Sequence, residues 1–253
     1  MGSAGPPFLA GLSWGLDGLA VALSVVLAAV HVVVARFCIT EGGPRTRFLS
    51  VAGGVSVTYV FVRILPELQA GATTLEEQAA VVSAVFERHI YLVALLGFVV
   101  FYGLEWFVQH EGAGVNPDEA VAVFWLHVDS FAAYNALVGY LLVHREEPGV
   151  VSLLVFATAM ALHFLVNDIG LQQHHRESYA SRGRWVLAGG VLAGTAVGVL
   201  VDVGDVLLAG LFAFLAGGIV LNTIKEELPE ERDSHFWSFA MGAAPYSAVL
   251  VFA

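Results

Sequence analysis

The stretch AVAVFWLHVDSFAAYNALVGYLLVH, residues 120–144, decides the class of fold. It has the length and apolar character of a membrane-spanning helix, because about 20 apolar residues cross the roughly 30 Å hydrocarbon core of a bilayer. Its interior nevertheless contains the polar residues His127, Asp129, Ser130 and Asn135. An ionisable group at the centre of a bilayer costs about 2.5–3.5 kcal/mol by insertion scales, so such groups indicate a site or a pathway. The stretch therefore predicts a spanning helix that carries a functional site.

A second polar stretch of the same kind follows directly, VVSLLVFATAMALHFLVNDIG, residues 150–170. It holds His163, Asn167 and Asp168 near its C-terminal end. No other two adjacent apolar stretches of the sequence concentrate so many polar residues. We expect the functional site to lie between these two helices.

The composition extends this prediction to the whole chain. Of 253 residues, 58% are hydrophobic and only 13% are charged, which excludes an ordinary soluble domain. Strands of a membrane barrel would be about ten residues long with alternating polarity, and the apolar blocks here are longer and uniform. We expect an all-α, polytopic membrane protein with one transmembrane domain over residues 1–253. The eight expected spans are residues 12–35, 48–65, 89–108, 120–143, 150–170, 185–201, 206–224 and 236–252.

The distribution of Lys and Arg predicts the orientation in the membrane. With the N-terminus outside, eight of the eleven Lys and Arg residues fall on the inner side and three on the outer side. We therefore expect a protein of the cell membrane with both termini extracytoplasmic. The net charge of −11 argues against a nucleic-acid partner and against a polybasic lipid-binding surface. Membrane lipid and a cation are the expected partners.

An internal repeat links the second and seventh expected spans. Each ends in the sequence Leu-Pro-Glu, at residues 65–67 and 228–230, and each has an Ala-Gly-Gly patch about eleven residues earlier, at residues 52–54 and 216–218. The two spans run in opposite directions, which is typical of an inverted-topology repeat in secondary transporters. We expect the first three helices to be repeated, inverted, in the last three. Chance similarity of two helix ends is the alternative.

Eight spans, external termini, the two Leu-Pro-Glu ends and the polar fourth and fifth spans together resemble the ZIP (Zrt/Irt-like) family of divalent-metal transporters. The resemblance implies a divalent transition metal, Zn, Fe, Mn or Co, as cargo rather than cofactor. Family members carry His-Asn/Ser-x-x-Glu/Asp-Gly in the fourth span and His-x-x-x-Glu-Gly in the fifth. In this sequence His163 matches the fifth-span His, and Asn167 replaces the carboxylate. In the fourth span Asp129 stands in place of His, Ser130 is kept, and Ala133 replaces the carboxylate.

The expected metal site consists of Asp129, His163 and Asn167. His163 and Asn167 are four residues apart and so share one helix face. An imidazole, an amide oxygen and a carboxylate form a nitrogen and oxygen ligand set that suits Zn²⁺ or another transition metal. The alternatives are a hydrogen-bonded His163–Asp129 pair that locks two helices, and a proton relay.

Further polar residues are expected around this site. His127 lies about 200° around the helix from Asp129, so the two side chains face different surroundings. Arg63, Glu67 and Glu105 are expected at the mouth of the pathway or in gating, with Arg63 paired to a carboxylate. The accessory residues are Ser130, His127, Asp168, His174 and His175.

A stripe of glycines in the sixth expected span, Gly190, Gly194 and Gly198, predicts close helix packing. Packing within the chain is the first interpretation, and a homodimer interface is the alternative. The sequence contains no GxSxG, GxxxxGK[ST] or HExxH motif, so we do not expect an enzyme. A divalent-metal transporter is the main hypothesis. A ZIP-fold membrane protein with a binding, sensing or assembly role is the second, and a membrane enzyme with His127 or His163 as base is the third.

Overall fold

The computed structural model describes residues 7–34, 43–70, 90–111, 117–145, 149–174, 176–227 and 235–252. Helices account for nearly all of these ranges, which contain no strand. Seven of the described helices have the length and apolar composition needed to cross a membrane. The prediction of an all-α, multi-pass membrane protein is therefore confirmed. The eighth expected span coincides with a shorter apolar helix of 17 residues, so the number of spans stays a prediction.

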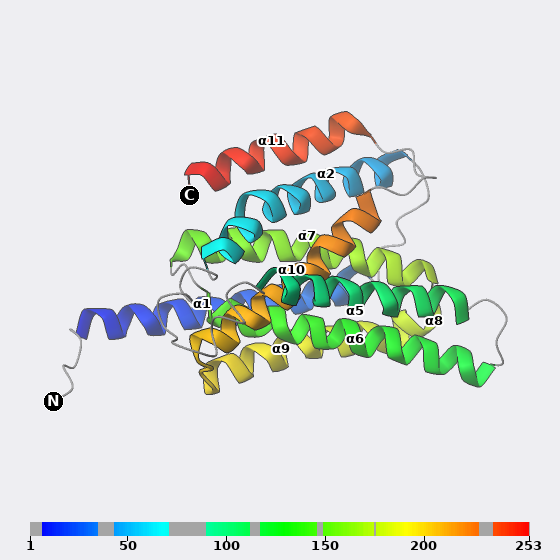
Figure 1. Cartoon of the computed structure of the whole chain (residues 1–253), viewed down its shortest axis with the longest axis horizontal. Helices are drawn as coiled ribbons and strands as arrows, with labels where there is room; N and C mark the ends of the chain where they lie inside the picture. Colours follow the sequence, from blue (N-terminus) through cyan, green and yellow to red (C-terminus); the bar gives the residue numbers. More distant parts are fainter. Residues whose placement is uncertain are drawn as a thin grey trace.

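The helices follow the expected spans closely (Figure 1). The sixth expected span, residues 185–201, corresponds to a helix over Arg184–Leu200. Two helices contain or begin with a π-helical turn, a wider turn that is frequently found at functional sites. In chain order the elements are α1 Pro7–Val34, α2 Gly43–Tyr59, η1 Val60–Ile64, α5 Ile90–Glu111, α6 Pro117–Val143, α7 Val150–His174, α8 Arg176–Ser178, η2 Tyr179–Gly183, α9 Arg184–Leu200, α10 Asp205–Glu227 and α11 Phe236–Phe252.

Three pairs of helices, α6 with α9, α5 with α10, and α2 with α11, form the most extensive contacts. In Figure 1 the α2–α11 pair forms one edge of the bundle and the α6–α9 pair the opposite edge, with α7 between them. Helix α1 packs on both α9 and α7. This arrangement encloses the polar segments of α6 and α7 between α1, α9 and α10.

Glycines determine how closely the paired helices approach. A Cβ atom added at Gly54 of α2 would overlap the backbone of Phe239 in α11, and one at Gly242 of α11 would overlap Val51 of α2. Helices α5 and α10 meet in the same way at Gly97 and Gly217. Such contact between backbones is how helices associate in lipid, where no hydrophobic force drives them together.

The glycine stripe of α9 packs within the chain. A Cβ atom at Gly190 or Gly194 would overlap the backbone of Ala132 or Ala136 in α6. The expected packing within the chain is therefore confirmed, and the homodimer stays a prediction. The lipid-facing surface is formed by large apolar side chains, for example Leu95, Leu96 and Val99 of α5, all about half exposed.

Candidate functional site

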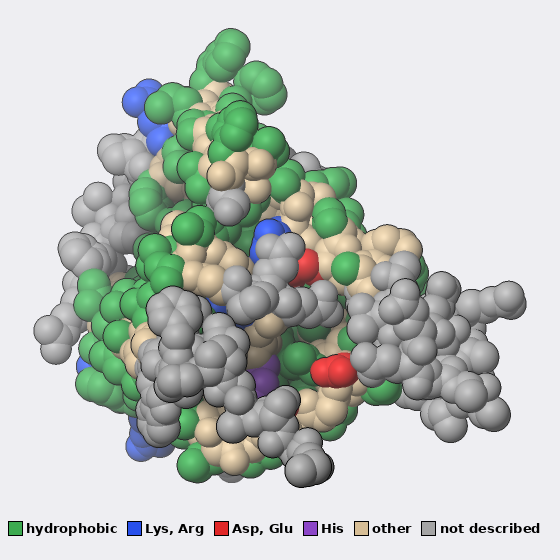
Figure 2. All heavy atoms as spheres, turned by 90° about the vertical axis from the view of Figure 1, so that its left-hand side faces the viewer, with side chains coloured by type: hydrophobic (Ala, Val, Ile, Leu, Met, Phe, Trp, Pro, Cys, Tyr) green, Lys and Arg blue, Asp and Glu red, His purple; other side chains and the backbone are tan. Residues whose placement is uncertain are grey.

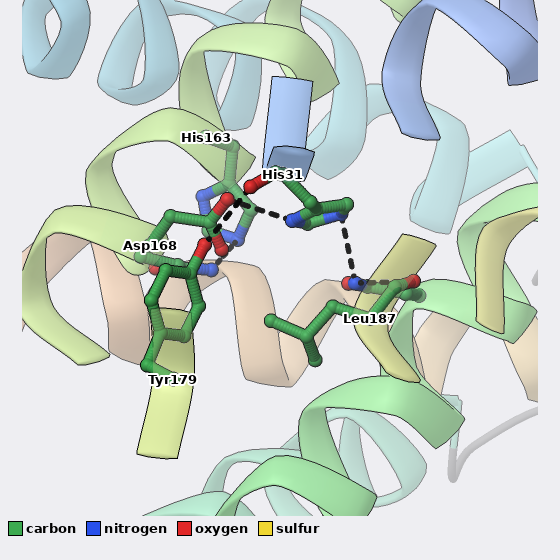
Figure 3. Close-up of polar contacts among 7 residues, drawn as sticks. His31, His163, Asp168, Tyr179 and Leu187 are labelled. Carbon is green, nitrogen blue, oxygen red and sulfur yellow. Dashed lines mark hydrogen bonds and ion pairs between the residues drawn. The ribbon is translucent and has the colours of Figure 1, made fainter. Parts of the chain in front are cut away.

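Helix α7 places three polar side chains in the centre of the bundle. His163, Asn167 and Asp168 are 3%, 8% and 0% exposed. His163 and Asn167 share one face because they are four residues apart, whereas Asp168 lies about 100° further around the helix. Across from them lie His31 of α1 and Asn135 of α6, which are 1% and 2% exposed (Figure 3). Four helices, α1, α6, α7 and α9, thus contribute to one buried polar network, which we call the central network.

The His31 imidazole bridges α7 and α6. Its Nδ1 lies 2.7 Å from Oδ2 of Asp168, and its Nε2 lies 3.0 Å from Nδ2 of Asn135. The same Nδ2 atom donates to the backbone oxygen of Leu187 in α9, at 3.4 Å. Figure 3 shows this chain of contacts from Asp168 through His31 to Leu187. The His31 ring and the Asn135 amide together connect the four helices of the central network.

The partners of this ring determine its protonation. A backbone carbonyl only accepts hydrogen bonds, so the Asn135 atom facing both Leu187 and His31 must be the amide nitrogen. That nitrogen donates to Nε2 of His31, which leaves the proton of the neutral ring on Nδ1. Nδ1 in turn donates to Oδ2 of Asp168, so the hydrogen bonds of His31 fit a neutral ring.

The remaining oxygen of Asp168 is available. Its Oδ1 atom is buried and accepts no hydrogen bond from the described residues. Tyr179 of η2 lies beside His31, and its hydroxyl donates to the His31 backbone oxygen at 3.4 Å. A buried carboxyl oxygen without a hydrogen-bond partner is costly. A bound cation would supply the missing partner.

His163 belongs to a second branch of the site. Its Nε2 atom lies 2.9 Å from the Tyr134 hydroxyl and 3.1 Å from Nδ2 of Asn167. Tyr134 is held in place by an edge-on contact with Phe101 of α5. The Nε2 atom would have to exchange one of these partners to bind a metal.

The structure does not bring the whole expected ligand set together. His163 and Asn167 lie in contact, whereas Asp129 is exposed on the opposite side of α6. The neighbouring Ser130 hydroxyl donates to the Leu126 carbonyl of its own helix, at 2.6 Å. Helix α6 instead places Tyr134 and Asn135 inside the bundle, each 2% exposed, whereas Asp129 is exposed. Of the other accessory residues, Asp168 is central, while His175 and the side chain of His174 lie outside the described residues.

A separate ionic cluster contains two of the other expected residues. Glu105 of α5 contacts Lys225 of α10 at 2.7 Å and His127 of α6 at 3.4 Å. The ring of His127 also packs near Phe131, with ring centres 5.2 Å apart. We call these three residues the Glu105 cluster. Here the carboxylate faces a lysine, so its charge is matched within the protein.

Arg63 pairs with a carboxylate as expected. Its Nε atom lies 2.5 Å from Oε1 of Glu67, and its Nη2 donates to Ser152 at 3.2 Å. A small cavity of about 20 Å³ opens beside Glu67 and Arg145, large enough for one water molecule. Partial burial lowers the pKa of the Arg145 guanidinium from its usual value. Figure 2 looks onto this end, where basic, acidic and histidine side chains lie near one another around a hollow.

Sequence reasoning missed His31, and it treated Asn135 only as one of several polar residues. The signal for His31 was present: a histidine within an otherwise apolar span, in the sequence LAAVHVVVA of residues 27–35. By the cost of polar groups in lipid, this single residue indicates a site.

A metal-binding constellation of three or more His, Cys, Asp or Glu side chains is not found among the residues that the structure describes. No family model matches the sequence, and no curated protein matches it. The metal site and the ZIP resemblance stay predictions that rest on the residues themselves.

Proposed function

We propose that the protein is a secondary transporter of ZIP-like architecture that carries a divalent transition-metal cation through the central network. The observation that carries this proposal is the buried Asp168, whose Oδ1 atom has no hydrogen-bond partner among the described residues and whose Oδ2 atom contacts Nδ1 of His31. Metal binding requires a deprotonated carboxylate and a neutral imidazole, and the hydrogen bond from Asn135 to Nε2 of His31 fits the neutral ring. In this proposal Asp168 supplies the anionic ligand.

The two histidines would complete the ligand set. His31 already touches Asp168, and His163 lies five residues before it on the same helix. Both rings offer a nitrogen only after releasing a present partner, Asp168 or Asn135 for His31 and Asn167 or Tyr134 for His163. Such partners hold the ligands in place while the site is empty. A site that must exchange hydrogen bonds for metal binds weakly, which suits a carrier that has to release its cargo.

The packing of the helix pairs supports an inverted repeat. Positions 51 and 54 of α2 contact α11 as positions 214 and 217 of α10 contact α5, each 163 residues later. Positions 94, 97 and 98 of α5 match 239, 242 and 243 of α11, each 145 residues later. The two Leu-Pro-Glu sequences, at 65–67 and 228–230, are also 163 residues apart. Inverted repeats of this kind let secondary transporters open alternately to either side of the membrane.

The experiment that tests this proposal is metal uptake into liposomes that contain the purified protein. Zn²⁺, Mn²⁺, Fe²⁺ and Co²⁺ are each offered outside, and the internal metal is measured over time. We expect uptake of at least one metal by the native protein and loss of at least nine-tenths of it in Asp168→Asn, which keeps the shape and removes the charge.

Asp129→Asn provides the matched control, because Asp129 is an exposed carboxylate within the same bilayer region. We expect uptake by this variant to equal that of the native protein. If Asp129→Asn lost uptake and Asp168→Asn retained it, the anionic ligand would be Asp129, as expected from the sequence. Absence of uptake of all four metals by the native protein would contradict transport.

A second candidate is a ZIP-fold membrane protein that binds, senses or assembles without transport. It is favoured by the internal hydrogen bonds of His31, Asn135 and His163, since all three are satisfied within the protein. This candidate predicts that metals raise the melting temperature without being transported.

A further inference from the structure

A groove on the lipid-facing side of the bundle lies between α2, α10 and α11. Its cavity volume is about 500 Å³, and most of its lining is apolar, including Val57, Phe61 and Val220. Phe61 is 66% exposed, so the groove opens sideways into the hydrocarbon region. The groove extends along α2 from Ser50 to Leu65, about 22 Å at 1.5 Å per residue. Half of the hydrocarbon core is about 15 Å thick, so this length accommodates one lipid tail.

One end of the groove is polar. Ser50, Thr223 and His235 line it there, close to the point where α2 and α11 begin and α10 ends. The Ser50 hydroxyl accepts a hydrogen bond from the backbone nitrogen of His235, at 3.3 Å. This end of the groove therefore lies at the level of the lipid headgroups, and the apolar part extends from it towards the bilayer centre.

The hydroxyl of Thr223, which lines the groove, indicates that a molecule binds there. Thr223 is only 6% exposed, and its Oγ1 atom has no hydrogen-bond partner among the described residues. Thr158 and Thr195, by contrast, donate to the carbonyl four residues earlier, at 2.7 and 3.0 Å. A buried hydroxyl without a hydrogen-bond partner destabilises the protein. An oxygen atom of a molecule in the groove would supply the acceptor that the protein does not.

A basic residue, Arg47, precedes the polar end of the groove by about one helical turn of α2. Arg47, Ser50 and Val57 lie three and seven residues apart, so they occupy one stripe of α2 that runs along the groove. Arg47 is exposed at the start of this span. A guanidinium group at the headgroup level complements a phosphate, which it can bind through two parallel hydrogen bonds.

We propose that this groove is a binding site for a glycerophospholipid. One tail lies along Val57, Phe61 and Val220, an oxygen of the glycerol region accepts from Thr223, and the phosphate pairs with Arg47. This site is separate from the central network, and the inference does not depend on transport.

Native mass spectrometry of the full-length protein in detergent tests the proposal. After removal of co-purified lipid, the protein is titrated with phosphatidylglycerol, phosphatidylcholine or diacylglycerol that carry the same tails. We expect one molecule of either phospholipid to bind per chain. Diacylglycerol lacks the phosphate and is expected to bind at least tenfold more weakly.

Thr223→Val and Arg47→Gln are each expected to weaken phospholipid binding roughly three- to tenfold, through the loss of one hydrogen bond or ion pair. Val220→Trp, which fills the groove, is expected to abolish it. Thr158→Val is the matched control, because the Thr158 hydroxyl is satisfied within its own helix, and it should bind lipid as the native protein does. Equal affinity of Thr223→Val and Thr158→Val, or equal binding of diacylglycerol and phospholipid, would overturn the proposal. Recovery of dimers in place of a lipid complex would do so as well.

Discussion

The central network and the Glu105 cluster are both buried polar groups within the bundle, and they differ in how their charge is compensated. Glu105 lies 2.7 Å from the ammonium group of Lys225, so a fixed cation of the protein matches its charge. Asp168 contacts Nδ1 of His31 and interacts with the Tyr179 hydroxyl, and no Lys or Arg among the described residues forms an ion pair with it. A matched ion pair connects helices. Under the proposed function, the Glu105 cluster holds helices together and the central network binds the cation.

The largest effect is expected for metal-dependent stability at Asp168. A ligand present at 100 times its Kd stabilises the native state by about 2.7 kcal/mol. We expect Zn²⁺ or another transported metal to raise the melting temperature of the native protein accordingly, and to leave that of Asp168→Asn unchanged. Thermal unfolding in detergent with and without metal measures both. An equal metal response in Asp168→Asn would remove the distinction between the two clusters.

The next effect concerns Lys225. Lys225→Met leaves Glu105 without its cation, and breaking a fully buried ion pair costs about 3–5 kcal/mol. Because the Lys225 side chain is 30% exposed, we expect a smaller loss, on the order of 2 kcal/mol, in the free energy of unfolding. Chemical denaturation measures it. Metal-dependent stabilisation should persist in this variant, since the central network is intact.

Removing both charges of the Glu105–Lys225 pair tests whether the cost of the single variant comes from an unpaired charge. In Lys225→Met combined with Glu105→Gln, no buried charge is left alone, and replacement of a whole pair is often neutral. We expect the double variant to recover to within about 1 kcal/mol of the native protein. A double-mutant cycle with both single variants gives the coupling energy. Additive losses would mean that Glu105 and Lys225 act independently.

The smallest effect is expected at the edge of the central network. Tyr179→Phe removes a hydroxyl whose hydrogen bond to the His31 carbonyl is long, at 3.4 Å. We expect a loss of about 0.5–1 kcal/mol in the free energy of unfolding. Tyr91→Phe is the comparison variant, because its hydroxyl bonds to Gln69 at an exposed site. A larger loss in Tyr91→Phe than in Tyr179→Phe would contradict the importance of the buried contact.

The sequence predicted the helices well because the length of an apolar block is set by the bilayer. It also placed His163 and Asn167 together, since a separation of four residues fixes a shared face whatever the surroundings. The direction of Asp129 could not be derived in this way. Helix α6 carries polar residues on several faces, so its rotation is determined by packing against α9 and α7.

His31 illustrates a second limit. It contacts Asp168 across 137 residues of sequence, and no short-range pattern links the two. Its position within an apolar span was a usable signal, but the identity of its partner follows only from the way α1 packs against α7 and α9. Local spacing therefore predicted one branch of the site, and tertiary packing determined the other.

The glycine contacts between helix pairs have a mechanical consequence. Where Gly54 and Gly242 bring the backbones of α2 and α11 together, no side chain separates the two helices and sliding would force atoms to overlap. The same holds for α5 and α10 at Gly97 and Gly217. Each pair of helices should therefore move as one rigid unit. Relative displacement is then confined to the surfaces between pairs, where side chains meet and can exchange neighbours.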